Sequence, residues 1–245
     1  LRKLVAIAES MLFADSILDR SPISFSLLST SSLSSVRKLP KAELFFATNK
    51  YREFKLNFIL GSSSPRRLEL LGSIGINPDK VVSPDINEKI NKNESPLEYS
   101  KRISFEKINS LKNSFPNDVL LTADTVAYCG RRLIDKTSKV EIAKVHLNLL
   151  SGRRHRVSTS ICIKDERGNI TKRTVTTSVS FKKLSQKEIN LYLDTKEWEG
   201  VAGSYRIQGY ASSFIKSING SYTNVVGLPL YETKNLLLSA GMHFY

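Results

Sequence analysis

The sequence predicts an α/β domain with a mixed sheet, preceded by a polar extension. Of the 245 residues, 40% are hydrophobic and 24% are charged, which is typical of a globular protein. From residue 57 onward predicted strands alternate with predicted helices, and a polar turn at 165–169 separates two strand-like runs. Strands joined through helices commonly pair in parallel, whereas a hairpin pairs antiparallel, so we expect one sheet with both pairings.

Residues 1–55 are predicted to be an extension that packs little, and residues 56–245 to be the folded domain. Residues 21–35 hold eight serines in fifteen positions, a composition that does not build a core. A serine-rich, basic leader suits an organelle targeting peptide, but such peptides contain few acidic residues and this segment contains several. We therefore expect a poorly ordered extension or translated upstream sequence.

Four apolar runs predict strands. Phe58–Leu60 is a short strand that ends at a small-residue turn, and Val119–Tyr128 is a longer one. Val157–Lys164 and Ile170–Phe181 flank the polar turn at 165–169 and form the hairpin.

Capping patterns predict the helices. Pro65 fits the first position of a helix that ends at Gly72 or Gly75. Three capping boxes, in which a serine and a glutamate three residues apart bond each other's backbone N–H groups, predict three more helix starts. These pairs are Ser95 with Glu98, Ser138 with Glu141, and Ser185 with Glu188, and the helices are expected to end near Lys112, Leu150 and Asp194. A last helix follows Pro229 and is closed by Gly241.

The net charge of +14 predicts an anionic partner. A positive field favours nucleic acid, an anionic membrane or a phosphorylated small molecule, and composition does not choose among them. No stretch approaches the roughly 20 apolar residues of a membrane-spanning helix. Cys129 and Cys162 lie far apart without a CxxC spacing, which excludes a zinc ribbon or a redox pair. We expect a cytoplasmic protein with reduced thiols and no membrane contact.

The segment Gly61–Arg67 has the composition of an anion-binding loop. It lies between a predicted strand and a predicted helix, where unpaired N–H groups and the helix dipole favour negative charge. Arg66 and Arg67 add bidentate donors for a phosphate group. The segment matches neither the P-loop nor the GxGxxG pattern. The alternative is a well-capped helix that carries two solvated arginines.

Asp124 is the best candidate for a catalytic residue. It follows the apolar run 119–123, and a carboxylate within a buried strand is costly unless it is paired or binds a metal ion. The sequence therefore predicts that Asp124 has a charged partner.

Lys107 is the candidate cation. It shares one stripe of a predicted helix with the apolar residues Ile103 and Leu111, so its side chain points toward the interior or a cleft. The alternative is a surface lysine with a buried stem. Asp85 or Glu88 could supply a second carboxylate from a loop, although loop acids are usually only solvated.

The segment 198–209 is rich in glycine and aromatic residues. Ser204, Tyr205 and Gln208 offer hydrogen-bonding groups that suit a loop close to a planar ligand, and an ordinary surface connection is the alternative. His146 and His155 have no partners at metal-ligand spacing, so we expect no histidine metal site.

Six ordered motifs over some 180 residues together resemble the Maf family. They are Leu60–Arg67, Pro84–Glu88, Ala123–Val126, Ser151–His155, Ala202–Gly209 and Gly220–Leu230. The resemblance implies a two-lobed mixed-sheet domain of the inosine-triphosphatase-like fold, with a nucleotide in a central cleft. It implies a nucleoside triphosphate pyrophosphatase that needs a divalent cation, Mg²⁺ or Mn²⁺. The Ile207-Gln208-Gly209 element is similar to the branch that acts on dTTP and UTP.

The resemblance also implies roles for nine residues. Ser62, Arg66, Arg67 and Lys136 would bind the triphosphate, and Thr125 and Gln208, together with Arg66, would set the base preference. Glu88 and Asp124 would bind the metal ion and face the attacking water, and Lys107 would neutralise charge on the phosphates.

Two positions depart from the family pattern. Asp135-Lys136-Thr137 keeps the lysine of a Gly-Lys-Pro element but loses its proline, and Val201 stands where the family usually has a lysine. The alternative function is a basic protein that binds nucleic acid or a division partner and inhibits septum formation without turnover. We expect a nucleotide substrate rather than nucleic acid, and the sequence leaves a homodimer open.

Overall fold

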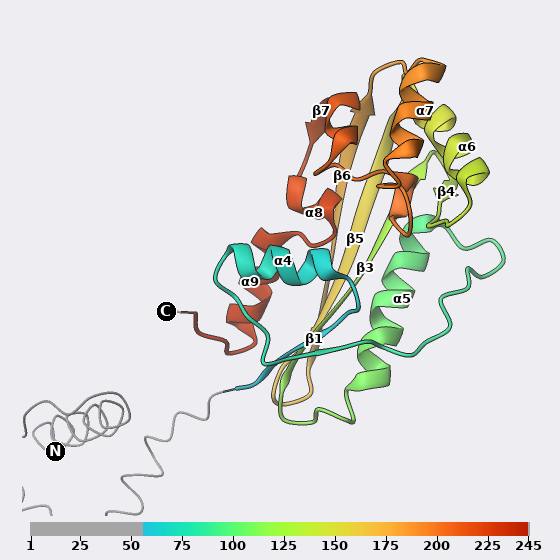
Figure 1. The fold of residues 1–245 in the computed structure, drawn as a ribbon. Coiled ribbons are helices and arrows are strands. Elements are labelled where there is room, and N and C mark those ends of the chain that lie inside the picture. Colours follow the sequence, from blue (N-terminus) through green and yellow to red (C-terminus); the bar gives the residue numbers. More distant parts are fainter. Residues whose placement is uncertain (1–55, 245) are drawn as a thin grey trace, which may run out of the picture. The chain divides into compact units, whose positions relative to one another are not determined.

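Residues 56–244 are described by the computed structural model, and they form a mixed α/β domain around one seven-stranded sheet (Figure 1). The sheet order is β2-β1-β3-β5-β6-β7, and β4 pairs with β3 outside this path. The strands are β1 (Phe58–Gly61), β2 (Lys80–Val82), β3 (Val119–Cys129), β4 (Arg132–Ile134), β5 (Arg154–Lys164), β6 (Ile170–Phe181) and β7 (Ile215–Asn219). β1 pairs in parallel with β2 and β3, and the remaining pairs are antiparallel. The predicted mixed sheet is confirmed.

All but one of the helices in residues 56–244 begin beside a proline or serine signal. They are α4 (Pro65–Ser73), α5 (Pro96–Leu111), α6 (Val140–Leu150), α7 (Gln186–Asp194), α8 (Tyr222–Val226) and α9 (Leu230–Ser239), with short 3₁₀ turns η1 (Ala202–Ser204) and η2 (Tyr210–Phe214). The capping boxes that begin α5 at Ser95 and α7 at Ser185 are present as predicted.

The third predicted capping box is wrong. α6 begins one residue later than expected, at Val140, and its N-cap residue is Lys139, which makes no side-chain cap bond. The backbone N–H of Lys139 instead bonds the hydroxyl of Thr137 at 3.0 Å. This turn therefore leaves Ser138 outside the position from which it could cap the helix.

β3 is the central strand, and its side chains alternate between two faces of the sheet. Leu121, Ala123 and Ala127 pack into the larger core cluster, which also includes residues of α4, α6, α7 and α9. Leu120 and Val126 pack against α5 on the other face. Because both faces are covered, nearly every β3 side chain is buried.

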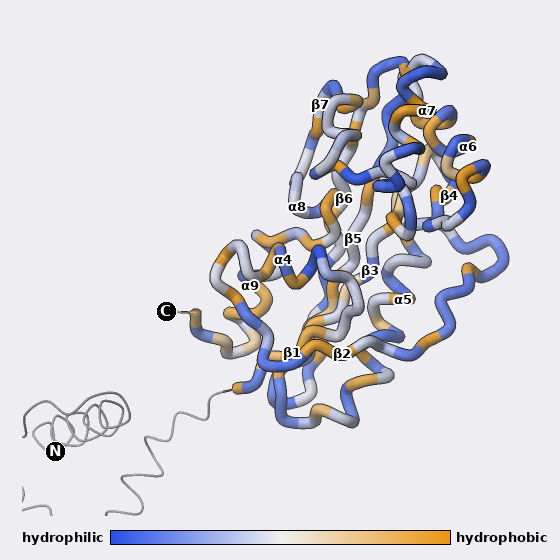
Figure 2. The backbone as a smooth tube through the Cα atoms, viewed as in Figure 1, coloured by the Kyte–Doolittle hydropathy of each residue, from blue (hydrophilic) through white to orange (hydrophobic). Residues whose placement is uncertain are grey.

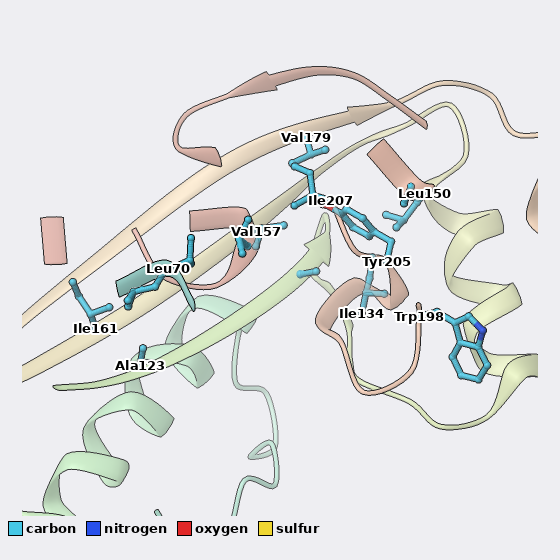
Figure 3. Packing of buried hydrophobic residues seen from close by; sticks show 14 of the residues in the cluster. Leu70, Ala123, Ile134, Leu150, Val157, Ile161, Val179, Trp198, Tyr205 and Ile207 are labelled. Carbon is cyan, nitrogen blue, oxygen red and sulfur yellow. The ribbon is translucent and has the colours of Figure 1, made fainter. Parts of the chain in front are cut away.

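The three long strands β3, β5 and β6 join two lobes of the domain. Figure 1 shows β1, α4 and α9 at one end of these strands and α6, α7 and β7 at the other. The apolar residues in Figure 2 concentrate on the strands and on the helix faces toward them, whereas the loop from β2 to α5 is polar. The larger core cluster runs into the second lobe, where Trp198, Tyr205 and Ile207 are buried near Leu150 (Figure 3).

β5 begins earlier than the apolar pattern predicts, at Arg154 rather than Val157. Strand alternation then exposes Arg154 and Arg156 and turns His155 inward, where it is 1% exposed. Within residues 56–244, no helix is long and apolar enough to cross a membrane. The predicted extension at residues 1–55 lies outside the described residues.

Candidate active site

The predicted anion-binding loop, Gly61–Arg67, lies where β1 ends and α4 begins. Gly61 ends the strand in such close contact with β3 that an added Cβ would lie 2.7 Å from Thr122 Cγ2. The following serines bring the N-terminus of α4 to the wall of a cavity, and Ser64 N donates to Ser62 Oγ at 3.2 Å. The dipole of α4 and the arginine side chains of its first turn make the loop suitable for an anion.

Arg67 is buried, at 8% exposure, and organises the floor of this cavity. Its Nη1 donates to Ser62 Oγ at 2.8 Å and its Nη2 to Thr125 Oγ1 at 3.2 Å. Its Nε donates to the carbonyl oxygen of Gly227 at 3.0 Å. These three bonds tie the loop, β3 and the turn after α8 to one guanidinium group, which also faces the cavity.

Arg66 and Arg206 bring two further guanidinium groups to the cavity wall. Burial lowers the pKa of Arg66, and the nearby charge of Arg206 lowers it further. Like charges in one cavity favour an anionic occupant, because an anion between them removes their repulsion.

Lys107 joins the two predicted carboxylates. Its Nζ lies 2.7 Å from Glu88 Oε1 and donates to Asp124 Oδ1 at 3.1 Å. Asp124 is 3% exposed, as its place in an apolar strand predicts, and Lys107 is 6% exposed, which decides between the inward and the surface alternatives for that lysine. Two carboxylates on one lysine leave a net negative charge, and Asp124 Oδ2 is buried without a hydrogen-bond partner.

Glu88 stays ionised although it is partly buried. Burial alone would raise its pKa, but the hydrogen bond from Lys107 and the charges of Lys107, Lys136 and Arg67 outweigh burial and lower the pKa. Asp85, the alternative second carboxylate, is exposed and does not line the cavity.

The carboxylate pair fits a divalent cation. Glu88 and Asp124 both line a smaller cavity that adjoins the first, and the unpartnered Asp124 Oδ2 is a hard anionic oxygen of the type that Mg²⁺ and Mn²⁺ prefer. In residues 56–244, no group of three or more histidine, cysteine or acidic side chains is arranged to bind a metal ion. An ion held by Glu88 and Asp124 would therefore take its remaining ligands from the substrate and water.

All nine predicted site residues lie at these two adjoining cavities. Asp124 lines the smaller cavity, and Ser62, Arg66, Arg67, Lys107 and Gln208 line the larger one. Glu88, Thr125 and Lys136 line both. Lys136 reaches them from the turn after β4, where its backbone N–H bonds Asp135 Oδ1 at 2.7 Å. The turn keeps its lysine at the cavity although the family's proline is missing.

The opposite wall of the larger cavity is the segment 201–208, with Val201, Tyr205, Arg206 and Gln208 among its lining residues. Gln208 is exposed, and its amide has no hydrogen-bond partner among residues 56–244. Arg206 is not among the residues predicted from the sequence, although its position as a basic residue in segment 198–209 was a signal.

Comparison with known proteins identifies the family. A family model described as "Maf-like protein" matches residues 57–240. The chain belongs to the Maf family. A nucleoside triphosphate pyrophosphatase of Neorickettsia sennetsu is 48% identical over 186 residues, or 76% of this chain and 89% of that protein. A dTTP/UTP pyrophosphatase of Zymomonas mobilis is 46% identical over 185 residues, or 76% of this chain and 92% of that protein.

A solved Ham1 protein of Staphylococcus aureus is 15% identical and covers 51% of this Maf chain and 71% of its own, at a TM-score of 0.36. That likeness is too partial to support an inference. Five of the six Maf motifs line the two cavities, four of them through Ser62, Glu88, Asp124 and Gln208 and their neighbours. The Gly220–Leu230 motif also reaches the larger cavity, through Val225, Val226 and Gly227.

Proposed function

We propose that this Maf protein hydrolyses dTTP and UTP to the nucleoside monophosphate and pyrophosphate. One observation carries the proposal. A positively charged, anion-binding loop and a pair of carboxylates bridged by a lysine line the two adjoining cavities. The names of the relatives from Neorickettsia sennetsu and Zymomonas mobilis support a pyrophosphatase, and the second of them supports this substrate pair. A protein that only binds its partner has no need of a buried carboxylate such as Asp124.

The triphosphate would lie along the loop at Ser62. Arg66 and Arg206 would donate hydrogen bonds to the phosphate oxygens, each through two N–H groups. Arg67 would keep the loop in place through its three hydrogen bonds. Lys136 stands at the junction of the two cavities, where negative charge builds up as the leaving group departs. These cations favour the transition state because they are in position before the reaction begins.

Asp124 would position the attacking water and accept its proton. Lys107 holds Oδ1, so Oδ2 is the oxygen free to receive a proton. Water then attacks the α-phosphorus, a new oxygen–phosphorus bond forms, and the bond to the β-phosphoryl oxygen breaks to release pyrophosphate. Glu88, with Asp124 acting through the attacking water, would hold a Mg²⁺ or Mn²⁺ ion, which would neutralise phosphate charge and acidify that water.

The base would lie against segment 205–208. The Gln208 amide can donate to a carbonyl and accept from an N–H, which matches the edge of uracil or thymine. A matched edge leaves no buried polar group unpaired, and a mismatch costs about 1 to 3 kcal/mol for each unmade bond. Preference for UTP and dTTP over CTP by tenfold or more is the expected result.

The test is pyrophosphate release from a panel of dTTP, UTP, CTP, ATP and GTP, with Mg²⁺, with Mn²⁺ and with EDTA. We expect turnover of dTTP and UTP that requires the metal ion. A purified, folded protein that releases no pyrophosphate from any of the five would refute the enzymatic function, and a preference for CTP or a purine would refute only the substrate assignment.

A further inference from the structure

Three consecutive residues of the wall segment are each tied to a different element of the second lobe. Ser204 Oγ bonds His146 Nδ1 on α6 at 2.8 Å, and Tyr205 Oη bonds His155 Nε2 on β5 at 2.8 Å. The backbone N–H of Arg206 donates to the hydroxyl of Tyr192 on α7 at 3.1 Å. The segment is therefore held at three successive points, although it is a loop between helices.

Burying the imidazole of His155 beside Tyr205 costs folding free energy. His155 is 1% exposed and packs edge-on against Phe181 and Tyr205 at 5.1 and 5.4 Å between ring centroids. His155 Nδ1 is buried without a hydrogen-bond partner in the described chain. An unpaired buried polar group costs about 1 to 3 kcal/mol, and an apolar ring would fill the same space without that cost.

The hydrogen bond between His146 and Ser204 offsets part of the strain in the backbone at Ser204. Ser204 has a φ of 54°, a left-handed conformation that is unfavourable for a residue with a Cβ. Gly203 before it has a φ of 81°, and an added Cβ there would lie 3.0 Å from Ala127 Cβ and 3.1 Å from the Tyr205 ring. The backbone thus makes a tight turn directly before Tyr205, and the His146 bond holds that turn.

The tight turn decides which side chains face the cavity. Tyr205 and Ile207 line the cavity but are buried, as is Ser204, whereas Arg206 and Gln208 line it with exposed side chains. A shift of this segment by one residue would put Tyr205 and Ile207 at the exposed positions and Arg206 at a buried one. The three bonds fix the backbone or side chains of residues 204, 205 and 206. They therefore fix the position from which Arg206 and Gln208 reach the cavity.

We propose that His146, His155 and Tyr192 are positioning residues that together form a clamp on segment 204–208 and set its register toward the nucleotide base. None of the three needs to touch substrate, because each acts through Ser204, Tyr205 or Arg206. The proposal rests on the proposed function and adds to it the residues that hold in place the segment that carries Gln208. The hydroxyls of the two nearby residues Tyr205 and Thr125 bond His155 and Arg67.

Tyr192→Phe and His155→Gln test the clamp with little change in packing. Phenylalanine removes only the hydroxyl that accepts from Arg206, and glutamine at 155 places a terminal amide near the site of Nε2, whereas His155→Leu offers no polar atom. Tyr231→Phe is the matched control for the tyrosine, because Tyr231 is 77% exposed. His243→Ala is the control for the histidine, because His243 is exposed.

The measurements are kcat and KM for UTP and CTP and the melting temperature of each variant. We expect Tyr192→Phe and His155→Leu to lower kcat/KM for UTP about tenfold, the equivalent of one lost hydrogen bond, and to lower it less for CTP. His155→Gln should recover most of the selectivity, and both controls should match the wild type.

Two outcomes would overturn the clamp. One is a lower melting temperature with an unchanged ratio of UTP to CTP, which would make the three residues purely structural. The other is equal selectivity in His155→Gln and His155→Leu, because the polar contact would then not matter. If the wild type turns over neither substrate, the proposed function fails instead, and the clamp is tested by the ratio of Kd values for UMP and CMP, with the same two outcomes overturning it.

Discussion

At the scale of single residues, the site depends on one lysine between two carboxylates in different surroundings. Asp124 is fixed in a buried strand, and the Glu88 side chain is 42% exposed on a loop. Lys107 contacts both, so it removes the repulsion that would otherwise separate them. The buried carboxylate keeps a constant position, while the exposed one can adjust to the ion and the substrate.

Asp124→Asn should fold normally and lose turnover. The amide keeps the shape of the side chain but cannot accept a proton, and loss of a positioned base typically lowers the rate by about 10² to 10⁴. The measurement is kcat for UTP beside the melting temperature.

Asp85→Asn is the matched control, because Asp85 is exposed and lines neither cavity. It should retain wild-type turnover. A loss of less than tenfold in a stable Asp124→Asn protein would contradict the role proposed for Asp124.

Much of the site could be predicted from single residues in their local pattern. The apolar stripe through Ile103 and Leu111 places Lys107 inward, and the apolar run before Asp124 places that carboxylate in a buried strand. Sequence could not predict that the two side chains meet, because they are brought together by pairing of elements far apart in the chain. His155 lies between two arginines in the sequence, and only its strand register shows that it points inward.

At the scale of elements, β3 supplies both halves of the site through strand alternation. Asp124 faces α5 and bonds Lys107, whereas Thr125 faces the opposite side and bonds Arg67. β1 lies directly beside this strand and delivers the anion loop. Short strands such as β2, β4 and β7 were not predicted, because runs of three to five partly exposed residues pair only where a neighbouring strand is available.

Gly61→Ala and Gly72→Ala should change stability in opposite directions. A Cβ on Gly61 would meet Thr122 Cγ2 at 2.7 Å and Leu111 Cδ1 at 2.8 Å, and such overpacking typically costs about 1 to 3 kcal/mol. Gly72 lies within α4 and a Cβ there would meet only Asn77 Oδ1 at 3.9 Å, so alanine should stabilise the helix by about 0.5 to 1 kcal/mol. Urea denaturation of both variants measures the difference, and a stable Gly61→Ala would show that β1 and β3 can separate at the site.

Burial of His155 should lower the free energy of unfolding at acid pH. Burial lowers the pKa of His155 to about 4, below the ordinary value of about 6.5. As pH falls below 6.5 the unfolded chain takes up a proton that the folded chain does not, so stability falls until the pH approaches the folded pKa. Between pH 7 and pH 4.5 this should remove about 2 kcal/mol from the free energy of unfolding.

The measurement is the free energy of unfolding in urea at both pH values, for wild type and for His155→Gln. The difference between the two proteins isolates the contribution of His155, because they share all other titrating groups. The wild type should lose about 2 kcal/mol more than the variant. Equal losses would show that His155 is protonated in the fold or reached by water.

At the scale of the whole molecule, a long mixed sheet joins two lobes that carry different parts of the site. One lobe supplies the anion loop through β1 and α4, and the other supplies segment 201–208, with the carboxylate and lysine of β3 and α5 between them. The arrangement predicts a nucleotide that lies with its phosphates against the first lobe and its base against the second. Attack then falls on the phosphorus nearest the carboxylates, the α-phosphorus.

Hydrolysis of UTP in ¹⁸O-labelled water, followed by mass spectrometry of both products, identifies the phosphorus atom that water attacks. Attack on the α-phosphorus predicts one ¹⁸O atom in UMP and unlabelled pyrophosphate. Label in pyrophosphate, or release of UDP and inorganic phosphate, would place the attack on another phosphorus and contradict the account.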